Sequence, residues 1–310
     1  MCQGRKLSQT GGRSENGGVA VGSRAATPAG GGDKSAPGRE SRERGASKGV
    51  YAMRIYIHTD LEGISGIDRA EMVPRESEDY LQSCELLMGD LNAAVDGAFA
   101  GGATEVVVLD SHGGGGNFLL DMLDPRAVND TRPNGKWWGI MNETFEGTYF
   151  IGAHAMAGTM NGFLDHTQSS QSWYNYWVNG RRMGELAQWA LVAGHWGVPL
   201  VMVSGDEAAC AEAHDFFHPC KTAAVKRAVG RQRAEALPLE EARQRIWQAA
   251  RDAVAVIPKA RPFRPLMPME IIVEFTRTDY ADQAAQGQGV ERLDARAVRK
   301  VTDCALELFP

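Results

Sequence analysis

The sequence lacks any apolar run that approaches the roughly 18 residues needed to cross a bilayer. Its opening stretch, MCQGRKLSQTGGRSENGG, also lacks the apolar segment of a secretory signal. Both absences argue against a membrane-spanning or conventionally secreted protein. We therefore predict a cytoplasmic location and no membrane partner.

Cysteine is scarce and scattered. The five cysteines form no C-x-x-C pair, and their odd number does not suit a disulfide framework, so free thiols in a reducing compartment fit best. The part expected to fold has no basic block, and the formal net charge is −6. Nucleic acid is therefore not an expected partner.

Large apolar side chains are almost absent from residues 1–52, which are rich in Gly, Ser, Ala and Arg. Such a segment cannot bury enough surface to offset the entropy lost on ordering. We predict a disordered extension over residues 1–52 and a folded region over residues 53–310. The overall hydrophobic content of 43% supports a sizeable core in that region.

Strand and helix patterns alternate through the folded region, which predicts an α/β fold with a largely parallel sheet. An Asn179-Gly180 turn predicts a hairpin over residues 173–184. We expect strands at 54–59, 105–111, 147–154, 199–205 and 269–276. We expect helices at 77–102, 184–197, 206–217, 238–257 and 293–308.

Two carboxylates follow the first expected strand, in RIYIHTDLEGISG. Asp60 and Glu62 are alternate residues, so they project to the same side of an extended chain. Unpaired carboxylates so close would repel, and a bound cation is the simplest remedy. Gly63 would let the backbone turn tightly beside that cation.

Further ligand types follow the other strands, and the carboxyl ends of parallel strands meet at one edge of a sheet. Together with Asp60 and Glu62 they could hold two divalent cations, and mixed N and O donors suit Zn²⁺, with Mn²⁺ or Co²⁺ as alternatives. They are Asp110 and His112 after the second strand, His154 after the third, His166 in the next loop, and Glu185 at a helix start.

Other notable residues have simpler interpretations. His58 is interpreted as a packing or supporting residue, and His195 as a structural residue of its helix. His214 and His218 have no acidic partner at ligand spacing. The glycine run 113–116 is followed by no Gly-Lys-Ser/Thr, so it is not a P-loop, and we expect a pliable wall above His112.

Several motifs in one order resemble the M55 metallopeptidase family, typified by the D-aminopeptidase encoded with bacterial dipeptide-transport genes. They span residues 53 to the C-terminus and read DLEGISG, EVVVLDSHG, FIGAHAMAGT, GFLDHT, VNGRRMGELAQWALVAGHWGVPLVMVSGD and KTAAVKRAVGR. The extension before them is not part of the family pattern.

The resemblance implies a fold of two α/β domains, one of them flavodoxin-like, with a boundary that the sequence does not locate. It implies two zinc ions per subunit, with Asp60 as the bridging acid. Glu62 and His112 would complete one metal's ligands, and His154 and Glu185 would bind the other. His166 would be catalytic. It also implies a homo-oligomer, a ring of ten subunits with active sites facing an inner channel.

The expected function is therefore that of a zinc-dependent aminopeptidase. It would release N-terminal residues, D-amino acids such as D-Ala, from short peptides or amides by means of a metal-activated water. His166 would either pass a proton to the leaving amine or attack directly. The alternatives are a two-metal phosphoesterase, a non-catalytic peptide- or metal-binding protein, and a structural zinc protein. Against the phosphoesterase, no Arg or Lys stands beside the ligand motifs to hold phosphate.

Overall fold

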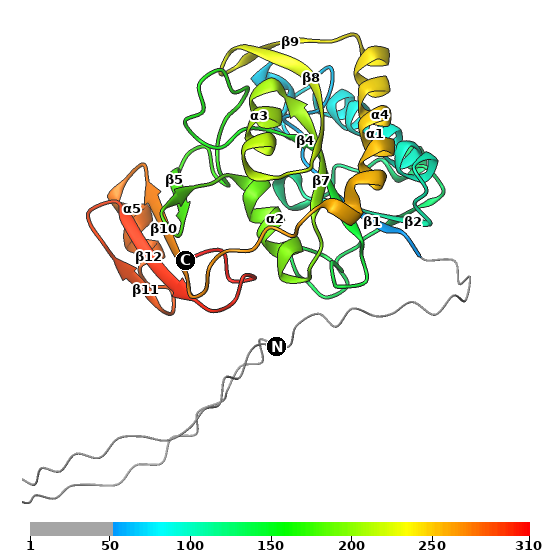
Figure 1. Cartoon of the computed structure of the whole chain (residues 1–310). Coiled ribbons are helices and arrows are strands. Elements are labelled where there is room, and N and C mark those ends of the chain that lie inside the picture. The colour runs from blue at the N-terminus through cyan, green and yellow to red at the C-terminus, as the bar shows by residue number, and fades with distance from the viewer. Residues whose placement is uncertain (1–51) are drawn as a thin grey trace, which may run out of the picture. The chain divides into compact units, whose positions relative to one another are not determined.

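A computed structural model describes residues 52–310 (Figure 1), so nearly all of the predicted disordered extension lies outside the described residues and stays a prediction. The larger sheet, sheet A, has seven strands in the order β3-β2-β1-β4-β7-β8-β9, and all neighbours are parallel except β8 and β9. Its strands are β1 (Arg54–Thr59), β2 (Glu105–Asp110), β3 (Ala127–Asn129), β4 (Gly147–Ala153), β7 (Leu200–Asp206), β8 (Lys221–Gly230) and β9 (Arg233–Ala236).

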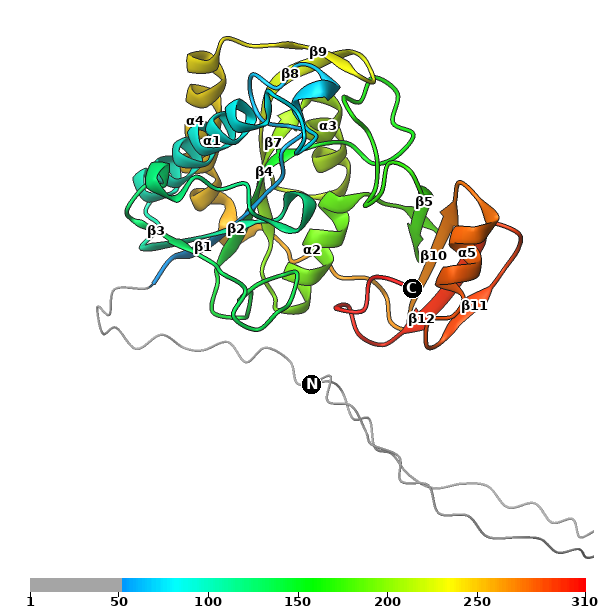
Figure 2. The ribbon, with the colours of Figure 1, turned by 180° about the vertical axis from the view of Figure 1, so that it is seen from behind.

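Helices cover both faces of sheet A, which is why its central strands are apolar on both sides. Alternate residues of β1 face opposite ways: Ile55 packs in the core under α1 (Tyr80–Ala100) and α4 (Leu239–Val256). Tyr56 packs in the other core, with α2 (Glu185–His195) and α3 (Glu207–Phe216). Figures 1 and 2 both place α1 beside α4.

A second sheet, sheet B, is antiparallel and has the order β11-β12-β10-β5-β6. Its strands are β5 (Trp173–Val178), β6 (Arg181–Arg182), β10 (Met269–Phe275), β11 (Val290–Arg292) and β12 (Ala297–Thr302). Helix α5 (Thr278–Ala284) contacts β10, β11 and β12. Within residues 52–310, short 3₁₀ helices lie at Ala70–Met72, His112–Gly114, Leu120–Met122 and Ile257–Lys259.

The predicted α/β fold with a mostly parallel sheet is confirmed. Without the short strands β3 and β9, sheet A has the order β2-β1-β4-β7-β8, which is the flavodoxin-like order 2-1-3-4-5. Sheet B joins β5 and β6 from the middle of the chain to strands from its end. No single cut in the chain therefore separates the two sheets, and the predicted domain boundaries stay predictions.

The predicted hairpin is confirmed as β5–β6, with positive φ at Asn179 (50°) and Gly180 (76°), as a type I′ turn requires. The predicted helix at residues 293–308 is wrong, because Ala297–Thr302 is strand β12, paired with β10 and β11. Its Val298 and Val301 suit a pleated surface, and pairing between two strands outweighed a weak helical spacing.

The helices between residues 52 and 310 are all too short or too polar to cross a membrane.

The chain adds β2 on one side of β1 and β4 on the other, so the strand order reverses between β1 and β4. An open α/β sheet forms its crevice at such a point. Strand β1 ends at Thr59, so Asp60 to Glu62 leave the strand and turn across the end of β4, contrary to the extended arrangement expected from the sequence. The Gly63 amide donates to the Gly152 carbonyl at 2.8 Å. A Cβ on Gly63 would lie 2.1 Å from the Ala153 carbonyl oxygen, so only glycine fits this crossing.

Substitution Gly63→Ala should therefore lower the free energy of unfolding by about 3 kcal/mol or more, because its neighbours are backbone atoms that cannot move aside cheaply. Gly230→Ala is the control, since a Cβ there meets no atom within 4 Å. Urea unfolding followed by circular dichroism measures both. Equal stability of the two variants would contradict the tight crossing.

Candidate metal centre

Six acidic and histidine side chains from separate segments meet at the carboxyl edge of sheet A. The turn after β1 supplies two of them, and the loops after β2 and β4, the loop before β5, and the start of α2 supply the rest. They are six of the seven candidates expected from the sequence: Asp60, Glu62, His112, His154, His166 and Glu185. The seventh, Asp110, belongs to neither group and instead accepts hydrogen bonds from the backbone and side-chain amides of Asn117, both at 2.6 Å. The structure thus brings all six together as two groups of three.

The first group contains Asp60, Glu62 and His112. The Nδ1 atom of His112 lies 3.0 Å from Oδ1 of Asp60 and 3.1 Å from Oε2 of Glu62. Both carboxylates are buried, whereas His112 is partly exposed to the cavity. One ligand atom from each residue lies within 4.8 Å of the others, which is close enough for all three to reach one ion.

The second group contains His154, His166 and Glu185. The two imidazole rings stack with centroids 4.0 Å apart, and their Nε2 atoms lie 3.5 and 3.7 Å from Oε1 of Glu185. Asp60 joins the groups, because its other oxygen, Oδ2, lies 3.3 Å from Nε2 of His154. One carboxylate therefore faces both groups, each through a separate oxygen.

Hydrogen bonds to the backbone orient both histidines of the second group. The Nδ1–H groups of His154 and His166 donate to the carbonyl oxygens of Ala155 (3.0 Å) and Leu164 (2.7 Å). A carbonyl can only accept, so Nδ1 carries a proton and Nε2 is the nitrogen that faces the group. Fixing the tautomer this way is typical of metal-binding histidines.

Two buried atoms test whether cations fit. Glu62 Oε2 and His154 Nε2 are fully buried and make no hydrogen bond of good geometry within the described chain, although each lies within 3.3 Å of an ion-pair partner. Buried polar atoms without partners are costly and rare. One such atom lies in each group and faces the other members, so a divalent ion in each group would satisfy both. The donor set of imidazoles and carboxylates matches zinc chemistry.

Charge compensation within the cluster is strong. Burial alone would lower the pKa of His112, but the charge of Glu62 and the contacts with Asp60 and Glu62 raise it to about 11. Burial would likewise lower the pKa of His154, yet Asp60 and Glu185 raise it well above the usual value. Burial opposes ionisation of Glu185, but His154 and His166 lower its pKa to about 2. Protons on His112 and His154 can thus balance the carboxylate charges that bound cations would otherwise balance.

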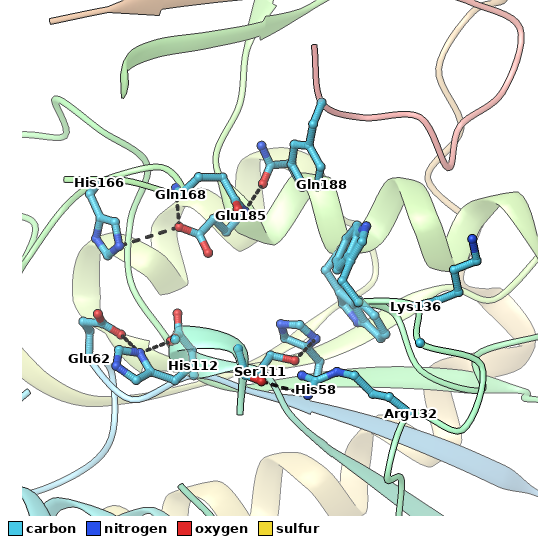
Figure 3. Close-up of a pocket in the computed structure, with 17 residues that line it drawn as sticks. His58, Glu62, Ser111, His112, Arg132, Lys136, His166, Gln168, Glu185 and Gln188 are labelled. Atoms are coloured by element: carbon cyan, nitrogen blue, oxygen red, sulfur yellow. Dashed lines mark hydrogen bonds and ion pairs between the residues drawn. The ribbon is translucent and has the colours of Figure 1, made fainter. Parts of the chain in front are cut away.

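The groups lie in a cavity of about 580 Å³ (Figure 3), and sequence reasoning missed several residues that line it. His58 was interpreted as a supporting residue, although it is two residues before Asp60 on the same side of β1, a signal that could have placed it in the cavity. It stacks on Trp189 with centroids 4.3 Å apart, and burial lowers its pKa to about 3. His195, His214 and His218 do not line this cavity.

Two cations also line the cavity. Arg132 and Lys136 come from the segment between β3 and β4, at least 18 residues from any of the ligand residues in the sequence. The argument that no Arg or Lys stands beside the ligand motifs considered only neighbours in the sequence. The fold brings Arg132 and Lys136 to the cavity, so that argument against a phosphoesterase does not hold. Nothing in the local sequence marked these residues, because the loop that carries them has no periodic pattern.

The glycine run also lines the cavity, through Gly113 and Gly114, as expected for a wall beside His112. All four glycines have positive φ, between 54° and 95°. The wall is held rather than pliable. Arg75 donates to the carbonyls of Gly113 (3.3 Å) and Gly115 (2.6 Å), and Arg132 donates to that of Gly114 (3.1 Å).

A flavodoxin-ordered sheet with a buried carboxylate–histidine cluster at its switch point is the arrangement of a metal-dependent hydrolase. The family model of peptidase family M55, described as D-aminopeptidase, matches residues 53–310. The chain belongs to this family. The predicted metallo-aminopeptidase is thereby confirmed as the class of the enzyme.

A similar sequence and a similar solved structure agree with this assignment. A D-aminopeptidase of Bacillus subtilis (strain 168) is 31% identical over 242 residues, which are 77% of this chain and 87% of that protein. A solved structure, the Zn-dependent D-aminopeptidase DppA from Bacillus subtilis, described as a self-compartmentalizing protease, matches with a TM-score of 0.78 and 29% identity. That match covers 83% of this chain and 94% of the other.

Cation binding should release about two protons at pH 7.5, because the protonated His112 and His154 must lose them to become ligands. Apparent affinity should therefore rise with pH, by up to about 100-fold per unit if two protons leave. Calorimetric titration of the chelator-treated protein with Zn²⁺, in two buffers of different ionisation enthalpy, counts these protons. His112→Ala should release about one fewer. Uptake without proton release would contradict the picture in which protonated His112 and His154 exchange their protons for a cation.

Proposed function

We propose that the protein hydrolyses the N-terminal peptide bond of short peptides, with a preference for an N-terminal D-residue such as D-Ala, and that it binds two zinc ions per subunit. The observation that carries this proposal is Asp60, which faces one ligand group at 3.0 Å and the other at 3.3 Å. A carboxylate shared by two groups is what a two-cation site needs. The description of the similar sequence and of the similar structure as D-aminopeptidase supports the substrate class.

In this proposal Asp60 bridges the two ions, Glu62 and His112 hold one, and His154 and Glu185 hold the other. A zinc pair supplies an activated water and polarises the scissile carbonyl. The protein's own part is to fix the ligands, enclose the peptide in the cavity and move a proton. His166 belongs to the second group but is not needed as a ligand in this proposal, and its side chain lines the cavity. It is therefore the group available for that proton.

His166 is proposed to protonate the leaving amine from Nε2, since imidazole exchanges protons near neutral pH. Its Nδ1 is occupied by the Leu164 carbonyl, which leaves Nε2 as the reacting nitrogen. The same Nε2 lies 3.7 Å from Oε1 of Glu185, almost as near as that of His154. A second role, as a third ligand of the second ion, therefore competes with the catalytic one.

His166→Ala separates these roles. If His166 transfers a proton, the variant should still bind two zinc equivalents. Its kcat should fall by about 10²–10⁴-fold, which is the usual contribution of general acid–base catalysis. Elemental analysis gives the metal content, and hydrolysis of a D-alanyl peptide gives kcat. Loss of one zinc equivalent would assign His166 as a ligand instead. An unchanged kcat would remove it from the mechanism.

The alternative of a two-metal phosphoesterase is favoured by one observation, the presence of Arg132 and Lys136 in the cavity. A panel of D-Ala-p-nitroanilide, L-Ala-p-nitroanilide and p-nitrophenyl phosphate decides between the readings when offered to the zinc-loaded protein. We expect two zinc equivalents and turnover of the D-alanyl substrate above the other two. Turnover of the phosphate ester alone would reverse the assignment.

A homo-oligomer is proposed as well, and the similar structure described as self-compartmentalizing supports it. A ring of ten subunits and a cytoplasmic location stay predictions.

A further inference from the structure

The ligand groups and two basic side chains lie at different sides of the cavity. Figure 3 shows Glu62, His112 and His166 on one side, and Lys136 and Arg132 on the other, with His58 between them. Neither cation has a carboxylate oxygen within 4 Å of its side-chain nitrogens in the part of the chain between residues 52 and 310. Most arginines between residues 52 and 310 pair with an acid, as Arg54 does with Glu105 at 2.8 Å, whereas Arg132 does not, so its charge is available to the cavity.

Arg132 is held in place by the backbone. Its guanidinium donates to the carbonyls of Gly114 (3.1 Å) and Asp110, and its φ of 53° is unusual for a residue with a side chain. Its Nε is buried and has no hydrogen-bond partner among the described residues. Arg132 is therefore a fixed positive charge in the wall of the cavity, committed to supporting the glycine loop.

Lys136 is the second cation of the cavity. Its side chain is exposed and lines the cavity, and its Nζ lies 5.6 Å from the centre of the Trp138 ring. The loop beneath it is well anchored, because Asp130 accepts hydrogen bonds from Ile140 N (2.7 Å) and from the Tyr56 hydroxyl. The ammonium group can thus reach a ligand from a stable base.

Aromatic rings line the cavity beside the two cations. Trp137 lies 6.4 Å from Trp189 and 5.6 Å from Phe309, measured between ring centroids, and all three line the cavity. A ligand that fits this sequence of surfaces has an amine and carbonyl at the ligand groups, an apolar portion against the rings, and an anion at Lys136. A short zwitterionic peptide has these groups in this order.

We propose that Lys136, assisted by the field of Arg132, binds the C-terminal carboxylate of the peptide, so that the enzyme selects short peptides with a free carboxyl end. The residue after the scissile bond packs on Trp137 and Phe309. The volume of about 580 Å³ is that of a small-molecule site, in agreement with a short ligand. This inference rests on the proposed function, and it names the chemistry by which that site chooses its substrates.

The test compares D-Ala-D-Ala with D-Ala-D-Ala-amide, which differ only in the terminal charge. The zinc-loaded protein should hydrolyse the free acid with a kcat/KM about tenfold higher, mostly through KM, as a charge-assisted contact of about 1.4 kcal/mol would give. Lys136→Met should bring the acid-to-amide ratio towards 1, and Lys136→Arg should largely restore it. Lys259→Met, an exposed lysine away from the cavity, is the matched control and should keep the ratio of the unaltered protein.

Binding is measured separately from turnover, by calorimetry of both peptides with the zinc-loaded His166→Ala variant and with His166→Ala/Lys136→Met. Tighter binding of the acid that disappears with Lys136→Met supports the carboxylate site. Equal affinity for acid and amide, or a ratio that Lys136→Met leaves unchanged, overturns it while the aminopeptidase assignment stands. Selective binding of the acid without hydrolysis of either peptide by the unaltered protein would count against the proposed function alone.

Discussion

The structure depends on one arrangement of charge, the placing of Asp60 between two imidazole groups inside the protein. Three carboxylates and three histidines share this small space, and buried charges of one sign are unstable without compensation. The charges of Asp60, Glu62 and Glu185 raise the pKa values of His112 and His154, which burial alone would lower, so protons on these histidines can supply the compensation. A cluster that needs such compensation is predisposed to exchange protons for cations.

Groups behind the cluster hold its backbone. Lys226 is buried, and its Nζ donates to the carbonyls of Glu62 (2.7 Å) and Ile67 (2.6 Å), which fixes the turn after β1. Glu212 accepts a hydrogen bond from Met156 N (2.7 Å), two residues beyond His154. Burial lowers the pKa of Lys226 to about 7 and raises that of Glu212 to about 7. Because these groups act on the backbone, they orient the ligand-bearing segments without contacting a substrate.

The sequence was most informative where one physical rule connects local pattern to position in space. Polar residues that follow buried parallel strands must meet at one edge, so Asp60, His112 and His154 could be grouped before any coordinates were known. Arg132 and Lys136 could not, because an irregular loop brings them to the cavity. The helix predicted at residues 293–308 was wrong for a different reason. Ala297–Thr302 forms a strand because it pairs with β10 and β11, and such pairing leaves no trace in the local spacing of residues.

The ligand groups follow strand ends, whereas the basic and aromatic residues of the cavity come mostly from loops, so the two sides of the cavity differ in how they are held. The chemistry lies on segments anchored by sheet A and by the crossing of Gly63 with Gly152, where there is no room for a side chain. The cationic side lies on a loop anchored through Asp130, and the aromatic wall draws Phe309 from the far end of the chain. Changes in the loop alter charge and shape around the distal part of a substrate and leave the ligand groups in place. Selectivity can therefore vary within this fold without disturbing the arrangement around Asp60.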